Sequence, residues 1–143
     1  MVKKSSLLLL LFLLLCAPSY SQEDTKEETD KLTGKTDKVW VFQRFEKYMG
    51  NDKCKSGESW TFYSDSRVVI KKCVNREIKA DEKHWSIHRV SSLDVALKVD
   101  DVEYLLIFPP PKPGTARQSM ILRQKAQSKV SPTKDLIFYY EVD

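Results

Sequence analysis

The chain has 143 residues, of which 31% are charged, and a formal net charge of +4 at pH 7. Lysines and arginines alternate with acidic residues along the chain, without the basic stripe and interleaved aromatics typical of nucleic-acid-binding proteins. Only 4 glycines are present, and no GxSxG, phosphate-loop or EF-hand pattern occurs. The composition therefore argues against a nucleic-acid partner and against the common nucleotide, serine-hydrolase and calcium sites.

The N-terminus has the organisation of a secretory signal peptide. Lys3 and Lys4 precede a continuous apolar run over residues 7–17, and small residues lead up to Ser21. We expect residues 1–21 to be removed by cleavage before Gln22. The apolar run is shorter than the about 20 residues that a membrane-spanning helix needs. The sequence thus predicts an exported protein, periplasmic or secreted, with no transmembrane span after signal removal.

Cys16 leaves a minor alternative open, because bacterial lipoproteins are cleaved directly before a cysteine. Leu15 occupies the preceding position, where a small residue is normally required. The mature chain keeps Cys54 and Cys73, and an even pair in an oxidising compartment indicates a disulfide. Two reduced, buried cysteines are the alternative. A zinc site is not expected, since there is no CxxC pair and no further ligand nearby.

Residues 22–37 are almost wholly charged or polar, and Leu32 is their only sizeable apolar side chain. Such a segment buries too little apolar surface to offset its ordering entropy, which predicts a flexible polar linker. The remaining residues, 38–143, suit one small domain.

Within that domain apolar residues alternate with polar ones at a period of two, which is typical of strands. Short polar turns separate eight such segments, at residues 39–49, 58–64, 67–74, 83–90, 93–99, 102–108, 117–125 and 135–142. Residues 117–130 are the only stretch for which a helix is an alternative. Many short strands joined by short links predict an all-β fold, an eight-stranded antiparallel up-and-down barrel.

The two histidines, His84 and His88, lie four positions apart around Trp85. On a helix they would share one metal, but an HExxH site needs a glutamate where Trp85 stands. On a strand they lie about 13 Å apart, too far for one ion. We therefore expect both to face solvent and predict no metal, no cofactor and no catalytic residue, so the chain is not expected to be an enzyme.

Aromatic and aliphatic residues recur on the strand positions that would face the barrel interior. An eight-stranded barrel is either filled by its side chains or holds one small ligand, and the residue types leave both alternatives open. The candidate ligand-binding residues are Trp60, Phe62, Trp85, Ile87, Tyr104, Leu106, Phe108, Leu122, Phe138 and Tyr140.

Three motifs resemble the small lipocalin-like domains common in exported proteins of Bacteroidota. They are a glycine and tryptophan opening the first strand (Gly34, Trp40), a W-x-F-x-x-D hairpin (Trp60, Phe62, Asp65) and a W-x-I strand (Trp85, Ile87). The resemblance covers residues 32–143. It implies non-covalent binding of a small hydrophobic or amphipathic ligand within the barrel, and we expect a monomer.

The alternative hypothesis is a protein-interaction module with a filled barrel, such as an envelope inhibitor of a foreign hydrolase. In that case the proline-rich loop at residues 109–114 and the loop near Cys54 would form the contact surface. Prolines hold such a loop in an extended, pre-ordered form that a partner can dock against.

Overall fold

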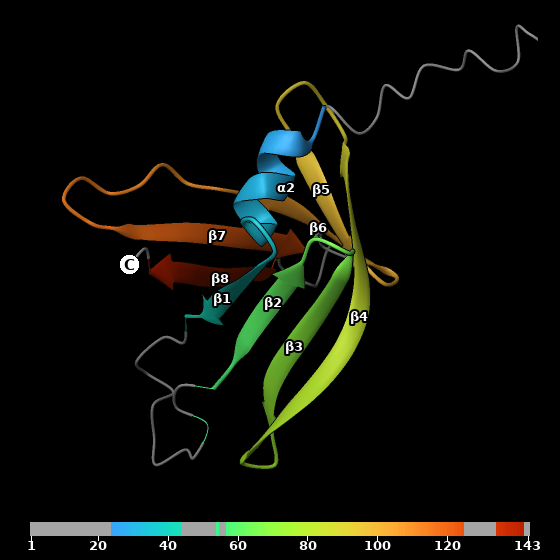
Figure 1. Ribbon diagram of the computed structural model, residues 1–143, viewed down its shortest axis with the longest axis vertical. Coiled ribbons are helices and arrows are strands. Elements are labelled where there is room, and N and C mark those ends of the chain that lie inside the picture. The colour runs from blue at the N-terminus through green and yellow to red at the C-terminus, as the bar shows by residue number, and fades with distance from the viewer. Residues whose placement is uncertain (1–23, 44–53, 55–56, 125–133, 142–143) are drawn as a thin grey trace, which may run out of the picture.

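The computed structural model describes residues 24–43, 54, 57–124 and 134–141, which form one helix and a closed barrel (Figure 1). Each strand pairs antiparallel with the next in sequence, and β8 closes the barrel against β1. The elements are α2 (Lys26–Thr33), β1 (Asp37–Phe42), β2 (Ser59–Tyr63), β3 (Arg67–Val74), β4 (Glu77–Arg89), β5 (Val95–Val99), β6 (Val102–Ile107), β7 (Arg117–Gln124) and β8 (Lys134–Glu141). The predicted eight-stranded up-and-down barrel is confirmed.

The first predicted strand, residues 39–49, lies partly outside the described residues. Among the predicted strands that are wholly described, the main difference is the length of β4. It begins at Glu77, six residues before the predicted start, and pairs with β3 as far as Val74. Residues 77–82 are exposed and four of the six are charged, so they carry little of the apolar signal that marks a strand in the sequence. Asn75 and Arg76 both have positive φ, as a two-residue hairpin of the favoured twist requires. Residues 117–124 form a strand, and the helical alternative for this stretch is wrong.

Side chains fill the middle of the barrel. The inward positions of the strands supply its fully buried residues, including Trp40, Phe62, Val68, Leu97, Met120, Leu122 and Phe138. Phe62 packs at a tilt against Trp60 and edge-on against Trp85, with ring centroids 6.1 Å and 5.9 Å away. Trp85 also donates its indole hydrogen to the Tyr63 and Arg67 carbonyls, at 3.1 Å and 3.0 Å. The central layer is therefore a packed aromatic core.

Helix α2 corrects the prediction for the N-terminal segment. Residues 26–33, expected to belong to a flexible polar linker, form a helix that lies over one end of the barrel (Figure 1). Leu32 is fully buried in the barrel core, and its carbonyl accepts a 2.9 Å hydrogen bond from Trp40 Nε1. One apolar side chain is enough to attach the helix to the barrel, because the buried Trp40 supplies both a packing surface and a hydrogen-bond donor for Leu32.

Charged groups hold α2 in place beside Leu32. Arg89 Nε lies 2.9 Å from the Asp24 carboxylate, and another guanidinium nitrogen lies 3.5 Å from Glu28. On the opposite side Lys38 Nζ donates to the Lys31 carbonyl at 3.0 Å. An eight-residue helix is marginal on its own in water. These long-range contacts stabilise it, and periodicity within residues 22–37 gives no sign of them.

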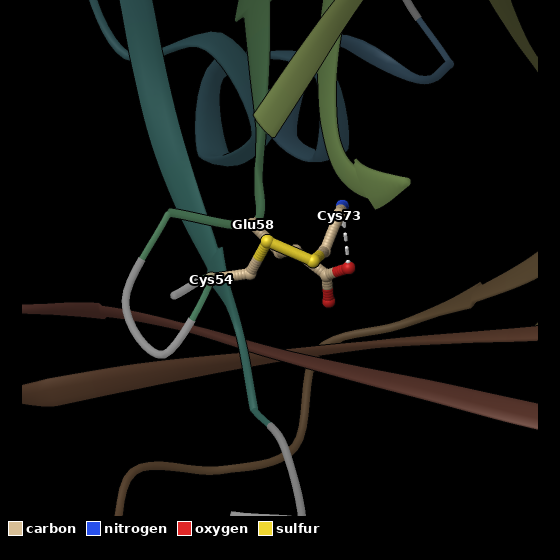
Figure 2. Close-up of a disulfide and its surroundings, with 3 residues drawn as sticks. All are labelled: Cys54, Glu58 and Cys73. Atoms are coloured by element: carbon tan, nitrogen blue, oxygen red, sulfur yellow. Dashed lines mark hydrogen bonds between the residues drawn. A yellow bond between two sulfur atoms is a disulfide. The ribbon is translucent and has the colours of Figure 1, made fainter. Parts of the chain in front are cut away.

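The predicted disulfide is confirmed: Cys54 and Cys73 are joined, with 5.7 Å between their Cα atoms (Figure 2). Glu58 lies beside the bond and accepts a 2.8 Å hydrogen bond from the Cys73 backbone N–H (Figure 2). Gly57 lies so close to Ile78 that a Cβ atom added at residue 57 would lie 2.7 Å from Ile78 Cγ1. The absence of a side chain at residue 57 therefore allows the loop to approach β4.

Candidate binding pocket at the barrel mouth

The barrel is open at the end of β1 that lies away from α2. There a pocket of about 340 Å³ is formed by the end of β1, the start of β2, the end of β3 and parts of β6, β7 and β8. It is lined by Phe42, Glu58, Trp60, Lys71, Lys72, Tyr104, Gln124, Lys134, Leu136 and Phe138. We call this pocket the mouth pocket.

Aromatic rings form the floor of the mouth pocket. Trp60 packs edge-on against Tyr104 and Phe138, with ring centroids 5.9 Å and 5.3 Å apart. Phe42 adds a further edge contact to Phe138 at 5.4 Å. Trp60 is only 4% exposed and Phe138 is fully buried, so these two rings close the pocket towards the packed core. The floor is thus aromatic and closely packed, and a ligand can rest on it without entering the core.

Lysines stand around the rim. Lys71 and Lys72 come from the end of β3 and Lys134 from the start of β8, and all three are exposed. Glu58 is the only acidic residue among the described residues that line the pocket, and it is bonded to the Cys73 backbone. Among the described carboxylates, none lies within ion-pair distance of the three lysines. The described residues of the rim therefore carry net positive charge.

Tyr104 adds a polar group to the apolar floor. Burial raises the pKa of the Tyr104 phenol, which keeps the hydroxyl protonated at neutral pH. A protonated phenol both donates and accepts hydrogen bonds. The mouth pocket thus combines apolar surface, one hydroxyl group and a cationic rim, which is the arrangement that suits an amphipathic anion.

The structure divides the ten predicted ligand-binding residues among three places. Trp60, Tyr104 and Phe138 line the mouth pocket. Phe108 lines a second cleft beside the proline-rich loop. The others, Phe62, Trp85, Ile87, Leu106, Leu122 and Tyr140, belong to the core or pack against it. All ten do lie in one apolar cluster, so the alternation in sequence predicted which side of each strand faces inward.

The cationic rim was missed, although the sequence contains a signal for it. The inward positions of β3 are Val68 and Ile70, and one further step of the same alternation reaches Lys72. In β8 the inward Leu136 is likewise preceded at the same spacing by Lys134, whose strand partner is Gln124. An inward position that changes from apolar to lysine at a strand end marks the point where the barrel opens.

Both histidines are exposed on β4, as predicted. His88 Nε2 lies 3.5 Å from the Glu103 carboxylate on β6, and the His84 backbone N–H donates to Asp100 at 3.0 Å. In the part of the chain that the structure describes, no group of three or more metal-ligating side chains is found, and no helix is long and apolar enough to cross a membrane.

No known protein family, curated protein or solved structure matches this chain. The interpretation of the mouth pocket therefore depends on its own geometry and charge.

Proposed function

We propose that the protein is an exported, lipocalin-like binding protein that holds a small amphipathic anion in the mouth pocket. The apolar part of the ligand lies on Trp60, Tyr104 and Phe138, and its anionic head lies among the rim lysines. The observation that carries the proposal is the meeting of an aromatic floor with a lysine rim in a pocket of about 340 Å³. The Cys54–Cys73 disulfide supports export, since such bonds persist in oxidising compartments.

The two parts of the site contribute in different ways. Burial of apolar ligand surface contributes about 25 cal/mol per Å², less the ordering cost of association. Each exposed lysine–carboxylate contact contributes about 0.2–1 kcal/mol. Three such contacts give roughly a tenfold preference for an anionic head over a neutral one, since 1.4 kcal/mol is a factor of ten. Affinity thus depends mainly on the floor, and selectivity on the rim.

A matched series of ten-carbon ligands separates these contributions. Decanoate, decanol and decyltrimethylammonium have the same chain and carry an anionic, a neutral and a cationic head. Trp60 lies in the floor, so titration of tryptophan fluorescence below the micelle-forming concentration reports binding. We expect decanoate to bind roughly tenfold more tightly than decanol, and the cation to bind most weakly. If none of the three binds at about 1 mM, the proposed function is wrong.

Substitutions in the rim test the role of the lysines directly. In the double variant Lys72→Gln and Lys134→Gln, decanol should bind as before while decanoate loses most of its advantage, because only Lys71 remains of the three rim lysines. Lys98→Gln is the matched control, because Lys98 is an exposed lysine on β5 that does not line the pocket. If the double variant keeps the full preference for decanoate, the rim does not recognise the head group.

A further inference from the structure

A second cleft lies beside the proline-rich loop, at the α2 end of the barrel. It has a volume of about 380 Å³ and is lined by Lys31, Phe108, Pro109, Pro110, Pro111, Thr115, Ala116, Arg117, Gln118 and Ser119. The loop between β6 and β7 extends outward on the left of Figure 1, next to the start of β7. We call this cleft the β7 cleft.

The cleft exists because β6 stops pairing with β7 before β7 begins. The last pair is Ile107 with Ile121, whereas β7 continues outward to Arg117 and there pairs only with β8. Continuing the same register would place Pro109 opposite Ser119. Proline has no backbone N–H and cannot donate to a ladder. The chain therefore leaves β7 at this point, and one edge of β7 loses its partner strand.

The hydrogen-bond pattern shows which way the Ser119 backbone points. The Gln43 N–H donates to the Ile137 carbonyl. The backbone N–H and C=O groups of odd-numbered residues in β8 therefore point towards β1, and those of even-numbered residues point towards β7. Their partners in β7 are also even-numbered, as in the pair Met120 with Phe138. Because backbone groups alternate sides along a strand, odd-numbered residues of β7 face the β6 side. Ser119 thus directs its N–H and C=O into the cleft, and no described backbone group there bonds to them.

Charge restricts what fits beside this edge. Lys31 and Arg117 line the cleft, and no carboxylate is among the described residues that line it. Lys31 lies 2.6 Å from Glu27 on its own helix, and the Arg117 guanidinium lies 4.4 Å from the centre of the Tyr139 ring. Glu27 partly balances the charge of Lys31, whose Nζ also lies 5.9 Å from the centre of the Phe108 ring in the cleft. The cleft therefore combines a strand edge, a proline wall and two positive charges.

We propose that an extended, acidic segment of a partner protein adds to the barrel as a short strand at the β7 edge. Its backbone bonds to the Ser119 N–H and C=O, and its acidic side chains lie near Lys31 and Arg117. Strand addition to an exposed sheet edge is a common mode of peptide recognition, in which main-chain hydrogen bonds supply affinity. This surface lies at the opposite end of β1 from the mouth pocket, so the proposal is independent of ligand binding there.

The test uses protein expressed from the full sequence and three fluorescein-labelled pentapeptides. The probe is acetyl-Asp-Val-Thr-Val-Asp, the charge control replaces both aspartates with lysine, and the backbone control is the acidic peptide N-methylated at alternate amides. Fluorescence anisotropy should show at least fivefold weaker binding of the basic peptide and at least tenfold weaker binding of the methylated one. Amide hydrogen exchange at Ser119, followed by NMR, should slow at least tenfold on saturation with the acidic peptide.

Two variants place the contact. Ser119→Pro removes the edge N–H while the bonds to β8, made by even-numbered residues, remain, and it should abolish peptide binding. Ser119→Ala keeps the N–H and should bind like the unaltered protein. Equal binding of the methylated peptide, which does not depend on any variant folding, would overturn the proposal. The proposal would also be overturned if the acidic peptide did not bind at about 1 mM. The same holds if amide hydrogen exchange at Ser119 stayed unchanged while the NMR signals of Tyr104 and Gln124 shifted.

Discussion

Replacing Leu32 with alanine tests whether α2 is an integral part of the domain. The Leu32 side chain is fully buried, and Trp40 Nε1 donates a 2.9 Å hydrogen bond to the Leu32 carbonyl. Truncating a buried leucine typically costs about 2–5 kcal/mol, because both transfer free energy and packing are lost. We expect a value near 3 kcal/mol, since the short helix can shift to fill part of the space. That is a large fraction of the about 5–15 kcal/mol that stabilises a small domain.

Urea unfolding of the unaltered protein and of Leu32→Ala at 25 °C measures the loss of stability, provided that the free energy of unfolding depends on urea equally in both proteins. Leu93→Ala is the matched control, because Leu93 is 90% exposed and its truncation should change stability by less than about 0.5 kcal/mol. If Leu32→Ala and Leu93→Ala unfold at the same urea concentration, α2 contributes nothing to the fold and the argument from burial is refuted.

Three further outcomes are expected. Replacing Cys54 and Cys73 with serine should cost about 3 kcal/mol in urea unfolding, since the bond closes a loop with a sequence separation of 19; no loss would mean that the loop is held by other contacts. Burial lowers the pKa of Lys38 below its usual 10.5, so the folded chain releases this proton at a lower pH than the unfolded chain, and stability rises with pH up to about 10.5. Between pH 8 and pH 10 the free energy of unfolding should therefore rise less for Lys38→Met than for the unaltered protein. An equal rise would contradict the assignment. Arg76→Gly should raise the free energy of unfolding by about 0.5–1 kcal/mol, because Arg76 has a φ of 66° in the hairpin after Asn75. An unchanged free energy in urea unfolding would show that the left-handed backbone of Arg76 costs nothing.

The strands and their inward faces were predictable from the sequence because both depend on local alternation. Trp60 and Phe62 alternate with Ser59 and Thr61, and the same period places Ile70 inside on the next strand. The disulfide was predictable as well, since the compartment and an even number of cysteines were enough to indicate it. These are properties that a few neighbouring residues, or a simple count, determine.

Helix α2 and the two cavities were not predictable in the same way, because contacts distant in sequence create them. Leu32 is ordered by Trp40, and the helix is fastened by Arg89, which lies 65 residues from Asp24. Whether an inward aromatic residue fills the core or lines a pocket depends on how far along the barrel axis it lies. Trp85 and Trp60 have the same alternation, yet only Trp60 reaches the mouth pocket.

A packed middle layer limits which ligands the proposed function allows. Because Trp60 and Phe138 close the mouth pocket against a core with Phe62 fully buried behind them, a ligand gains apolar contact only over the depth of the mouth. In a hollow barrel each additional buried methylene would add about 0.8 kcal/mol along the whole axis. Here that gain stops at the aromatic floor, and a longer chain extends into solvent. Under the proposed function we therefore expect short amphipathic ligands, for which the lysine rim contributes a larger share of the total affinity.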